Sequence, residues 1–215
     1  MRTALTIIMA AMLMASCGKD DEAQVYPPVS MEFATIGTGT GGGVELLYTD
    51  DGGTYLVHED KTGSRLNPSS NYRVVTTYQP LTMPAAGTYG TADIYTLTGV
   101  FCERSIPAIQ VSGGFATDPV EVRKVWRRGN FINIELGILA QDKQHQFDFI
   151  NDGREPGTDN VVIKLRHDDG DDYPAYTKTA YLSLQLTEFR QAGADSVAIN
   201  INTHDGWQRH AFAVD

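Results

Sequence analysis

The chain has 215 residues, of which 41% are hydrophobic and 20% charged, and this composition can bury a hydrophobic core and differs from that of disordered proteins. Its formal net charge is −10, whereas binding to nucleic-acid phosphates needs clusters of Lys and Arg. We therefore expect a folded protein with no nucleic-acid partner.

Residues 1–16 have the parts of a signal peptide. Arg2 supplies a positive end, an apolar run follows it, and two small residues, Ala15 and Ser16, precede a cleavage point. The apolar run is shorter than the roughly 20 residues that span a bilayer. The sequence Leu-Met-Ala-Ser-Cys, which ends at Cys17, resembles a bacterial lipobox, in which the cysteine sulfur accepts diacylglycerol. We expect a mature chain that begins at Cys17 and carries acyl chains such as palmitate there; the alternative is an ordinary secretory signal with a chance cysteine.

A lipidated tether is predicted over residues 17–30. It contains a lysine followed by three acids: Lys19, Asp20, Asp21 and Glu22. This run resembles the surface-export tag of some Gram-negative lipoproteins, which implies a lipid anchor in the outer membrane and exposure at the cell surface. The alternative is a charged tether that only stays in solvent. Residues 23–30 contain a Pro pair, which favours a semi-rigid stalk.

Cys102 is the second of the two cysteines in the chain. Because an acylated Cys17 cannot form a disulfide, Cys102 is predicted to be a lone thiol, and stability must come from packing. No histidine is close to it in sequence. We therefore expect a buried structural residue rather than a catalytic nucleophile.

Alternation of apolar and polar residues predicts strands in nearly all of the mature chain. Two strands, 43–49 and 54–58, flank Asp50-Asp51-Gly52-Gly53, which has the composition of a hairpin turn. Three more are predicted from β-branched and aromatic residues: 71–78, 92–101 and, to close the set, 106–111. Five short strands fit a small OB-like barrel, which we assign to residues 31–114.

A second series of strands is predicted after the break at residues 112–114. In residues 131–138 every even position is aliphatic, so one face of this strand is expected in the core. The same alternation recurs at Phe147 and Phe149, at Val161, Ile163 and Leu165, at Leu182, Leu184 and Leu186, at Val197, Ile199 and Ile201, and at Phe212 and Val214. These strands suggest an antiparallel β-sandwich over residues 115–215, with a short helical turn over 188–195. The predicted fold class is all-β, an OB-like barrel followed by a sandwich, behind a lipoprotein signal peptide.

The second half of the chain also resembles a known family. Residues 125–134, Val-Trp-Arg-Arg-Gly-Asn-Phe-Ile-Asn-Ile, and Leu165-Arg166-His167 with the polar loop after it are similar to the NigD-like lipoproteins. The resemblance is most specific over residues 118–215. Before residue 118 it concerns the layout of the strands more than the residues themselves. It implies an N-terminal OB-type barrel, a C-terminal β-sandwich and a cell-envelope lipoprotein named for a proposed role in immunity to a bacteriocin. It brings no catalytic residue, only an acylated cysteine at Cys17.

Several motifs favour structural interpretations. Residues 37–42 have G-x-G-x-x-G spacing, but a strand follows them, so a flexible or bulged strand entry is favoured over a dinucleotide site. Residues 168–172 offer the carboxylates that calcium prefers, yet they lack EF-hand spacing and suit a solvated turn, so calcium binding stays open. The histidines of the second half lack zinc-site spacing and favour strand packing: His145, His167, His204 and His210. We predict no metal and no other cofactor.

Trp126, Arg127 and Arg128 form the one basic spot of this acidic chain. A turn at Gly129-Asn130 is expected to project them, and Trp and Arg dominate binding energy at interfaces. They are candidate partner contacts, and the alternative is a pair of solvated hairpin charges. Trp126 and Trp207 are also candidates for a sugar platform, against a role in the core or rim.

The sequence contains no G-x-S-x-G or comparable catalytic motif. We expect a non-enzymatic cell-envelope lipoprotein that acts by binding, in bacteriocin immunity, with the lipid bilayer and a protein or peptide toxin as partners. The alternative is a surface glycan-binding accessory lipoprotein, because OB barrels and sandwiches present loops and aromatic faces to oligosaccharides. The fold does not by itself name the ligand.

Overall fold

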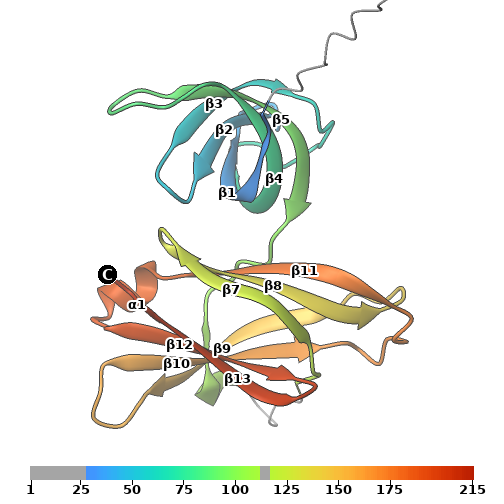
Figure 1. Ribbon diagram of the computed structural model, residues 1–215, viewed down its shortest axis with the longest axis vertical. Coiled ribbons are helices and arrows are strands. Elements are labelled where there is room, and N and C mark those ends of the chain that lie inside the picture. Colours follow the sequence, from blue (N-terminus) through green and yellow to red (C-terminus); the bar gives the residue numbers. More distant parts are fainter. Residues whose placement is uncertain (1–27, 112–116) are drawn as a thin grey trace, which may run out of the picture.

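The computed structural model describes residues 28–111 and 117–215. Residues 1–16, Cys17 and the run from Lys19 to Glu22, for which we predict a signal peptide, a lipid site and an export tag, lie outside the described residues. Within the described part nearly all regular structure is β, and Figure 1 shows a barrel stacked on a sandwich along the long axis of the molecule. The predicted all-β fold class is confirmed.

The first body is a closed five-stranded barrel. Its strands are β1 Ser30–Thr38, β2 Val44–Thr49, β3 Thr54–Asp60, β4 Asn71–Thr82 and β5 Gly90–Gly99. The strand order is β1-β2-β3-β5-β4, and β4 closes the barrel by pairing with β1. β3 and β5 are parallel, whereas the other neighbours are antiparallel. This arrangement is the predicted OB-like barrel.

The fifth strand of the barrel is β1, not the predicted strand 106–111. Sequence alternation fails in β1 because both of its faces are covered. Ala34 and Ile36 point into the barrel core and are fully buried. Phe33, on the opposite face, is also buried because it packs against Trp126 of the sandwich.

The second body is a β-sandwich of a five-stranded and a three-stranded sheet. The sheets have the orders β13-β12-β10-β9-β6 and β11-β8-β7. Their elements are β6 Ile106–Pro107, a 3-10 turn η1 Ala108–Gln110, β7 Glu121–Arg128, β8 Phe131–Ala140, β9 Gln146–Arg154, β10 Asn160–Asp168, β11 Tyr176–Gln185, α1 Thr187–Gln191, β12 Ser196–Thr203 and β13 Gly206–Ala213. The prediction of a purely antiparallel sandwich is wrong in one respect, because β10 pairs in parallel with β12 and β6 in parallel with β9. The chain reaches β12 from β10 by way of β11 in the other sheet and α1, a connection long enough for a parallel pair.

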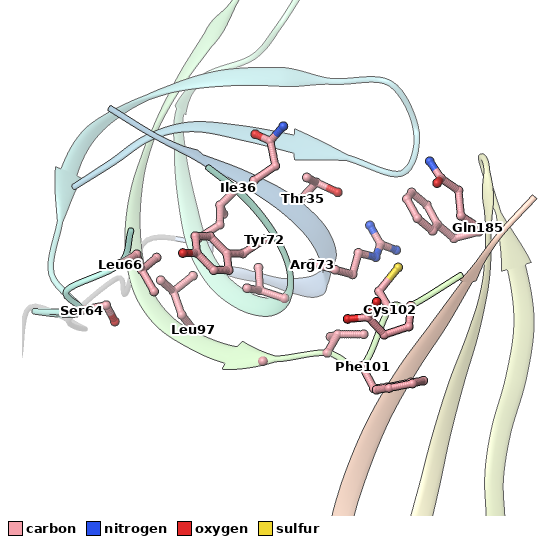
Figure 2. A pocket seen from close by; sticks show the side chains of 16 residues that line it. Thr35, Ile36, Ser64, Leu66, Tyr72, Arg73, Leu97, Phe101, Cys102 and Gln185 are labelled. Carbon is pink, nitrogen blue, oxygen red and sulfur yellow. The ribbon is translucent and has the colours of Figure 1, made fainter. Parts of the chain in front are cut away.

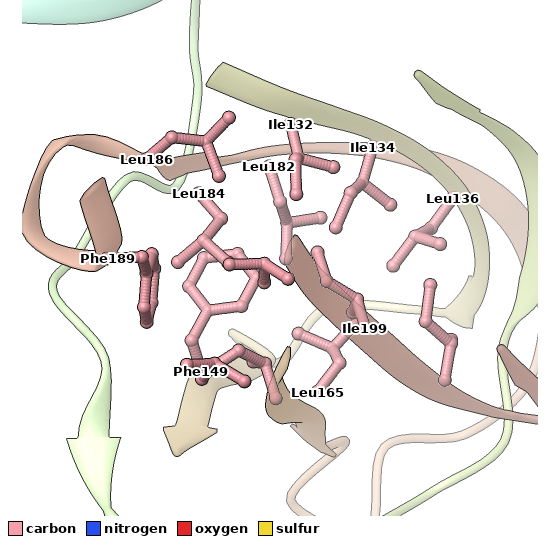
Figure 3. Close-up of a cluster of buried hydrophobic side chains, with 14 of the residues drawn as sticks. Ile132, Ile134, Leu136, Phe149, Leu165, Leu182, Leu184, Leu186, Phe189 and Ile199 are labelled. Carbon is pink, nitrogen blue, oxygen red and sulfur yellow. The ribbon is translucent and has the colours of Figure 1, made fainter. Parts of the chain in front are cut away.

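The sandwich core fills the space between its two sheets. Figure 3 shows side chains from both sheets meeting there. Ile132, Ile134 and Leu136 of β8, the predicted core face, are fully buried, and they lie opposite Leu165 and Ile199 of the other sheet. The barrel encloses a separate and smaller core.

The chain passes from barrel to sandwich soon after β5 ends at Gly99. Phe101 forms a bridge with Leu182 of β11, and β6 pairs with β9. Residues 101–110 therefore lie against the sandwich, whereas the predicted barrel domain, residues 31–114, includes them. Phe101 packs there against the sandwich core, while β1 and β4 already close the barrel.

Candidate functional site

A buried ion pair lies where the barrel meets the sandwich. Arg73 of β4 and Asp50, at the end of β2, both belong to the barrel, and their side chains are 4% and 2% exposed. Two guanidinium nitrogens, Nη1 and Nη2, donate to the two carboxylate oxygens of Asp50 at 2.6 Å each. This forked geometry is the strongest arrangement of an Arg–carboxylate pair.

The sandwich completes the pair with two neutral side chains. Asn133 of β8 accepts from Nη2 of Arg73 at 3.0 Å and donates to Asp50 at 2.9 Å. Ser183 of β11 accepts from Nε of Arg73 at 3.1 Å and donates to Asn133 at 2.7 Å. The ring of Phe131 lies 3.8 Å from the guanidinium carbon. Because these buried charges are paired and hydrogen-bonded, the network ties the two bodies together in one orientation.

A cleft with a volume of about 730 Å³ opens on one side of this network. We call it the interdomain cleft. Figure 2 shows Leu66, Tyr72 and Leu97 of the barrel on one wall, and Phe101 and Gln185 on the other. The lining combines apolar side chains with polar ones such as Asn71, Arg73 and Gln185, and such a cleft can bind peptides or small organic ligands.

Cys102 lies in the wall of the interdomain cleft. It is a free cysteine, but it is only half-buried, whereas we expected a buried one. Burial raises the pKa of its thiol, partly opposed by the positive charge of Arg73. The described residues that line this cleft include no histidine. The thiol therefore stays protonated near neutral pH and contributes a small apolar surface.

A smaller hollow of about 280 Å³ lies on the other side of the network. We call it the aromatic notch. Trp126 of β7 packs edge-on against Phe33 of the barrel, with ring centroids 5.1 Å apart. Phe33 makes a second edge contact with Tyr181 of β11, and Lys124 lies 4.6 Å above the Trp126 ring. The notch thus combines aromatic faces with charged rims.

The structure does not bring the three predicted partner contacts to one free surface. Trp126 lines the aromatic notch. Arg128 forms an ion pair with Asp51 and another with Glu32, both on the barrel, and the hydrogen bond to Asp51 raises its pKa above the ordinary value. Arg127 lies on the other face of β7, on the side of Val125, which packs against the sandwich core.

The turn that follows these residues faces the barrel, although we expected it to project into solvent. Gly129 has a φ of +54°, and a Cβ at this position would overlap the carbonyl oxygen of Asp50. The tip of the β7–β8 hairpin is therefore docked on the turn after β2. Sequence patterning could not show this, because the docking surface belongs to a segment about eighty residues earlier.

The predicted acidic turn at residues 168–172 has two kinds of carboxylate. Asp168 pairs with Arg166 near the surface. Asp172 is buried, and it accepts hydrogen bonds from the backbone N–H of Gln141 and from His145. Burial opposes its ionisation, but these hydrogen bonds outweigh burial and hold its pKa below the usual range. Among residues 28–111 and 117–215, no three His, Cys, Asp or Glu side chains are grouped so that they could hold a metal ion.

Two of the predicted strand histidines meet in the sandwich. Nδ1 of His145 and Nε2 of His167 are 2.8 Å apart, and Nδ1 of His167 lies 3.2 Å from the carbonyl oxygen of Asp118. Burial lowers the pKa of His167, which packs flat on Phe147. Together with Asp172 they form a buried polar chain, which the spacing of the histidines in sequence did not indicate.

The glycine-rich run 37–42 lies at the junction of β1 and β2. The register of this pair shifts between Gly37 and Thr38, which confirms the predicted bulge. Gly42 has a φ of +80° and lies against the backbone of Leu66, where a side chain would clash.

Within the described ranges, no helix has both the length and the apolar character needed to cross a membrane.

The chain is similar to a known protein family and to several solved structures. Residues 109–213 match the family model of the NigD-like C-terminal beta sandwich domain. A NigD-like immunity protein from Bacteroides caccae is 28% identical, with a TM-score of 0.71, and the match covers 88% of this chain and 99% of that one. Among curated proteins, none matches the chain.

Two more distant structures share the fold. A protein named as toxin-related, from Parabacteroides distasonis, is 16% identical with a TM-score of 0.65, over 86% of this chain and 92% of that one. A protein named as a lipoprotein, from Bacteroides fragilis, is 12% identical with a TM-score of 0.57, over 86% of this chain and 96% of that one. At these identities the likeness concerns the fold.

Proposed function

Because residues 109–213 make this chain a member of the NigD-like β-sandwich family, we propose that it is a non-enzymatic lipoprotein of the cell envelope that acts in immunity by binding a toxic peptide or protein. The observation that carries this proposal is the likeness to a NigD-like immunity protein over 99% of that chain. The likeness covers both bodies of the molecule, so it includes the cleft between them.

The interdomain cleft is the binding site in this proposal. It joins apolar walls, such as Leu66 and Phe101, to the polar rim residues Glu103 and Gln185. The hydrogen bonds of Arg73 to Asn133 and Ser183 hold the two walls in place, and a preformed site loses less conformational entropy when it binds. The protonated thiol of Cys102 supports binding rather than covalent chemistry.

A lipid anchor at Cys17 completes the proposal. Its support is the lipobox-like sequence before Cys17 and the shared fold of a solved structure named as a lipoprotein. The run Lys19 to Glu22 supports a position in the outer membrane, facing outward. More than one acyl chain gives stable anchoring, because each buried CH₂ contributes about 0.8 kcal/mol.

The binding site is tested by filling the cleft. Gln185, an exposed residue of β11, lines the cleft, so Gln185→Trp should obstruct it. Gln208 is an exposed strand residue of β13 that does not line the cleft, so Gln208→Trp is the matched control. The protein is incubated with secreted peptides, proteins and glycans of its native community. The captured material is then identified, and its affinity for each variant is measured.

We expect Gln185→Trp to weaken capture at least about tenfold, which corresponds to about 1.4 kcal/mol, while Gln208→Trp captures as the wild type does. Equal capture by both variants would remove the cleft from the interface. Capture of glycans alone would favour the accessory glycan-binding function over immunity. Cells that make the wild type or Gln208→Trp should be protected against the captured toxin. Loss of this protection only in cells that make Gln185→Trp would link binding to immunity.

The anchor has its own test. Cys17→Ser removes the sulfur that accepts the lipid, so incorporation of labelled fatty acid should be lost and the protein should leave the membrane fraction. Fatty-acid labelling that persists in the variant would contradict the anchor.

A further inference from the structure

The hairpin between β4 and β5 presents an apolar surface without charge. We define the hairpin tip as residues 81–89. Its large side chains are exposed: Leu81 by 43%, Met83 by 70% and Tyr89 by 63%. Residues 74–92 contain no Asp, Glu, Lys, Arg or His, in a chain of which 20% is charged. Contiguous exposed apolar residues of this kind mark a contact with another apolar phase or partner.

The hairpin tip is held in shape by the barrel. The backbone N–H of Thr88 donates to the carbonyl oxygen of Ala85 at 2.9 Å, and Gly87 has a φ of +76°, which closes a tight turn. At the base, the hydroxyl of Tyr55 lies 3.9 Å from the sulfur of Met83. The exposed side chains are therefore presented by a fixed turn, and little ordering is required when they meet a partner.

The hairpin tip and the start of the described chain lie toward the same end of the barrel. Ser30, the first residue of β1, pairs with Tyr78 of the antiparallel strand β4, and β4 continues past this pair to Thr82. Because the two strands are antiparallel, this continuation runs in the direction from which the chain enters β1. In Figure 1 the chain enters at the end of the barrel away from the sandwich, and the green hairpin extends from that end.

The chain length between the lipid site and the barrel limits where the membrane can be. Pro28 follows Cys17 by 11 residues. A chain segment of this length spans at most about 40 Å when fully extended. A lipid on Cys17 therefore holds the entry end of the barrel within about 40 Å of the bilayer surface, and the apolar hairpin tip lies toward that end.

We propose that the hairpin tip is a second membrane contact, which rests in the headgroup region of the bilayer that holds the acylated Cys17. Leu and Met supply apolar surface for this region, and Tyr is a side chain that favours the boundary between lipid and water. The absence of charge in residues 74–92 removes the cost of taking ions out of water there. The sandwich then points away from the bilayer and leaves the interdomain cleft open to large partners. This inference rests on the proposed lipid anchor.

The experiment uses the full lipoprotein, purified from membranes and reconstituted in vesicles of phosphatidylethanolamine and phosphatidylglycerol. Met83→Trp places a fluorescent probe in the hairpin tip. Tyr173→Trp is the matched control, because Tyr173 is also 70% exposed but lies in the β10–β11 connection of the sandwich. Tyr89→Trp is a second probe of the tip that leaves the contact of Met83 with Tyr55 intact. Emission is compared with that of the wild type, which carries Trp126 and Trp207, with and without lipids brominated near the headgroups.

We expect the added emission of Met83→Trp and Tyr89→Trp to shift to the blue and to lose most of its intensity with brominated lipids, while Tyr173→Trp is unaffected. Mass spectrometry of the N-terminal peptide checks acylation of Cys17 in the same samples. An acylated protein whose hairpin probes are not quenched would overturn the membrane contact and leave the anchor standing. A blue shift without quenching would assign the tip to a protein partner or a second copy instead, and an unacylated Cys17 would overturn the anchor and this inference together.

Discussion

Arg73 is the residue on which the contact between the two bodies depends most. Removal of its guanidinium leaves Asp50 as a buried charge without its partner, and such a loss costs about 3–5 kcal/mol. We therefore expect Arg73→Met to lower the free energy of unfolding by an amount in that range, measured by urea unfolding. The double variant Arg73→Met with Asp50→Leu should recover part of the loss, because it removes the orphaned carboxylate as well.

An exposed ion pair serves as the control for this prediction. Arg209 of β13 pairs with Glu155, and their side chains are 44% and 33% exposed. Pairs of this kind contribute about 0–1 kcal/mol, so Arg209→Met should change stability little. A similar effect of Arg73→Met and Arg209→Met would show that the buried network does not hold the bodies together.

The buried chain of His145, His167 and Asp172 predicts a dependence of stability on pH. Burial lowers the pKa of His167 below its unfolded value of about 6.5, so its neutral form is the one that the fold accepts. Its contribution is fully present above that value and is lost as the pH falls below it, because the unfolded chain then binds more protons. The pKa of Asp172 is also lowered, so its contribution is lost only when the pH falls below about 4, the unfolded value of an Asp.

We accordingly expect the free energy of unfolding to fall between about pH 7.5 and 5.5 in the wild type. His167→Gln should flatten this slope, leaving the part due to His210, whose pKa burial also lowers. His204 is exposed, so His204→Gln should keep the wild-type slope. Chemical unfolding at a series of pH values measures this slope for the wild type and both variants. An unchanged slope in His167→Gln would remove this histidine as the titrating group.

For single residues, the sequence predicted which side chains of a strand face the core, but not which segments contact the other face of that strand. The alternation in β8 correctly placed Ile132 and Ile134 in the core. It left Asn133 on the face opposite the predicted core, yet Asn133 is fully buried. The neighbouring sequence does not show whether a polar residue faces water or contacts a buried arginine, here Arg73, which lies 60 positions earlier in the chain. The network was therefore out of reach of periodicity.

Among the strands, β8 was predicted from its alternating aliphatic residues, and the β2–β3 hairpin from the composition of the turn between its strands. The structure confirms both predictions. β1 was missed because Phe33 and Ala34 are neighbours on opposite faces, and both are buried. The short β6 was assigned to the wrong body, since two paired residues carry too little pattern to choose a sheet.

The β7–β8 hairpin supplies a prediction about docking. Gly129 and Gly157 both have a positive φ, +54° and +76°, so an alanine is strained at either position. Only at Gly129 would the added Cβ also overlap another segment, the backbone of Asp50. Gly129→Ala should thus cost about 1–3 kcal/mol more than Gly157→Ala, measured by thermal or urea unfolding. Equal losses in the two variants would show that the hairpin does not press on the barrel.

The whole molecule is expected to unfold as one unit. The barrel and the sandwich have separate cores, yet the Arg73 network and the packing of Phe33 on Trp126 join them. Leu47→Ala in the barrel and Leu182→Ala in the sandwich each remove a fully buried side chain and should each cost about 2–5 kcal/mol. Both should shift the same single transition, followed by near-ultraviolet circular dichroism.

Removal of the junction should change this behaviour. With Arg73→Met in the background, Leu47→Ala should give two transitions, the first of which belongs to the barrel. Two transitions already in the wild type would contradict the coupling of the bodies. The sequence predicted two β domains from the break in patterning near residue 114, but it held no signal for how firmly they are joined, because that depends on contacts between segments far apart.

The position of the ion pair has a consequence for the order in which a growing chain can assemble. Asp50 and Arg73 both belong to the barrel, only 23 residues apart, whereas Asn133 and Ser183 follow Arg73 by 60 and 110 residues. A chain made from its N-terminus therefore completes the barrel, and with it the pair of opposite charges, before either sandwich partner exists. Before the sandwich forms, the barrel therefore exposes a hydrated ion pair of Arg73 and Asp50 on the side that the sandwich will cover, and not a single unpaired charge. The later half can then assemble on a template that already fixes its docking angle.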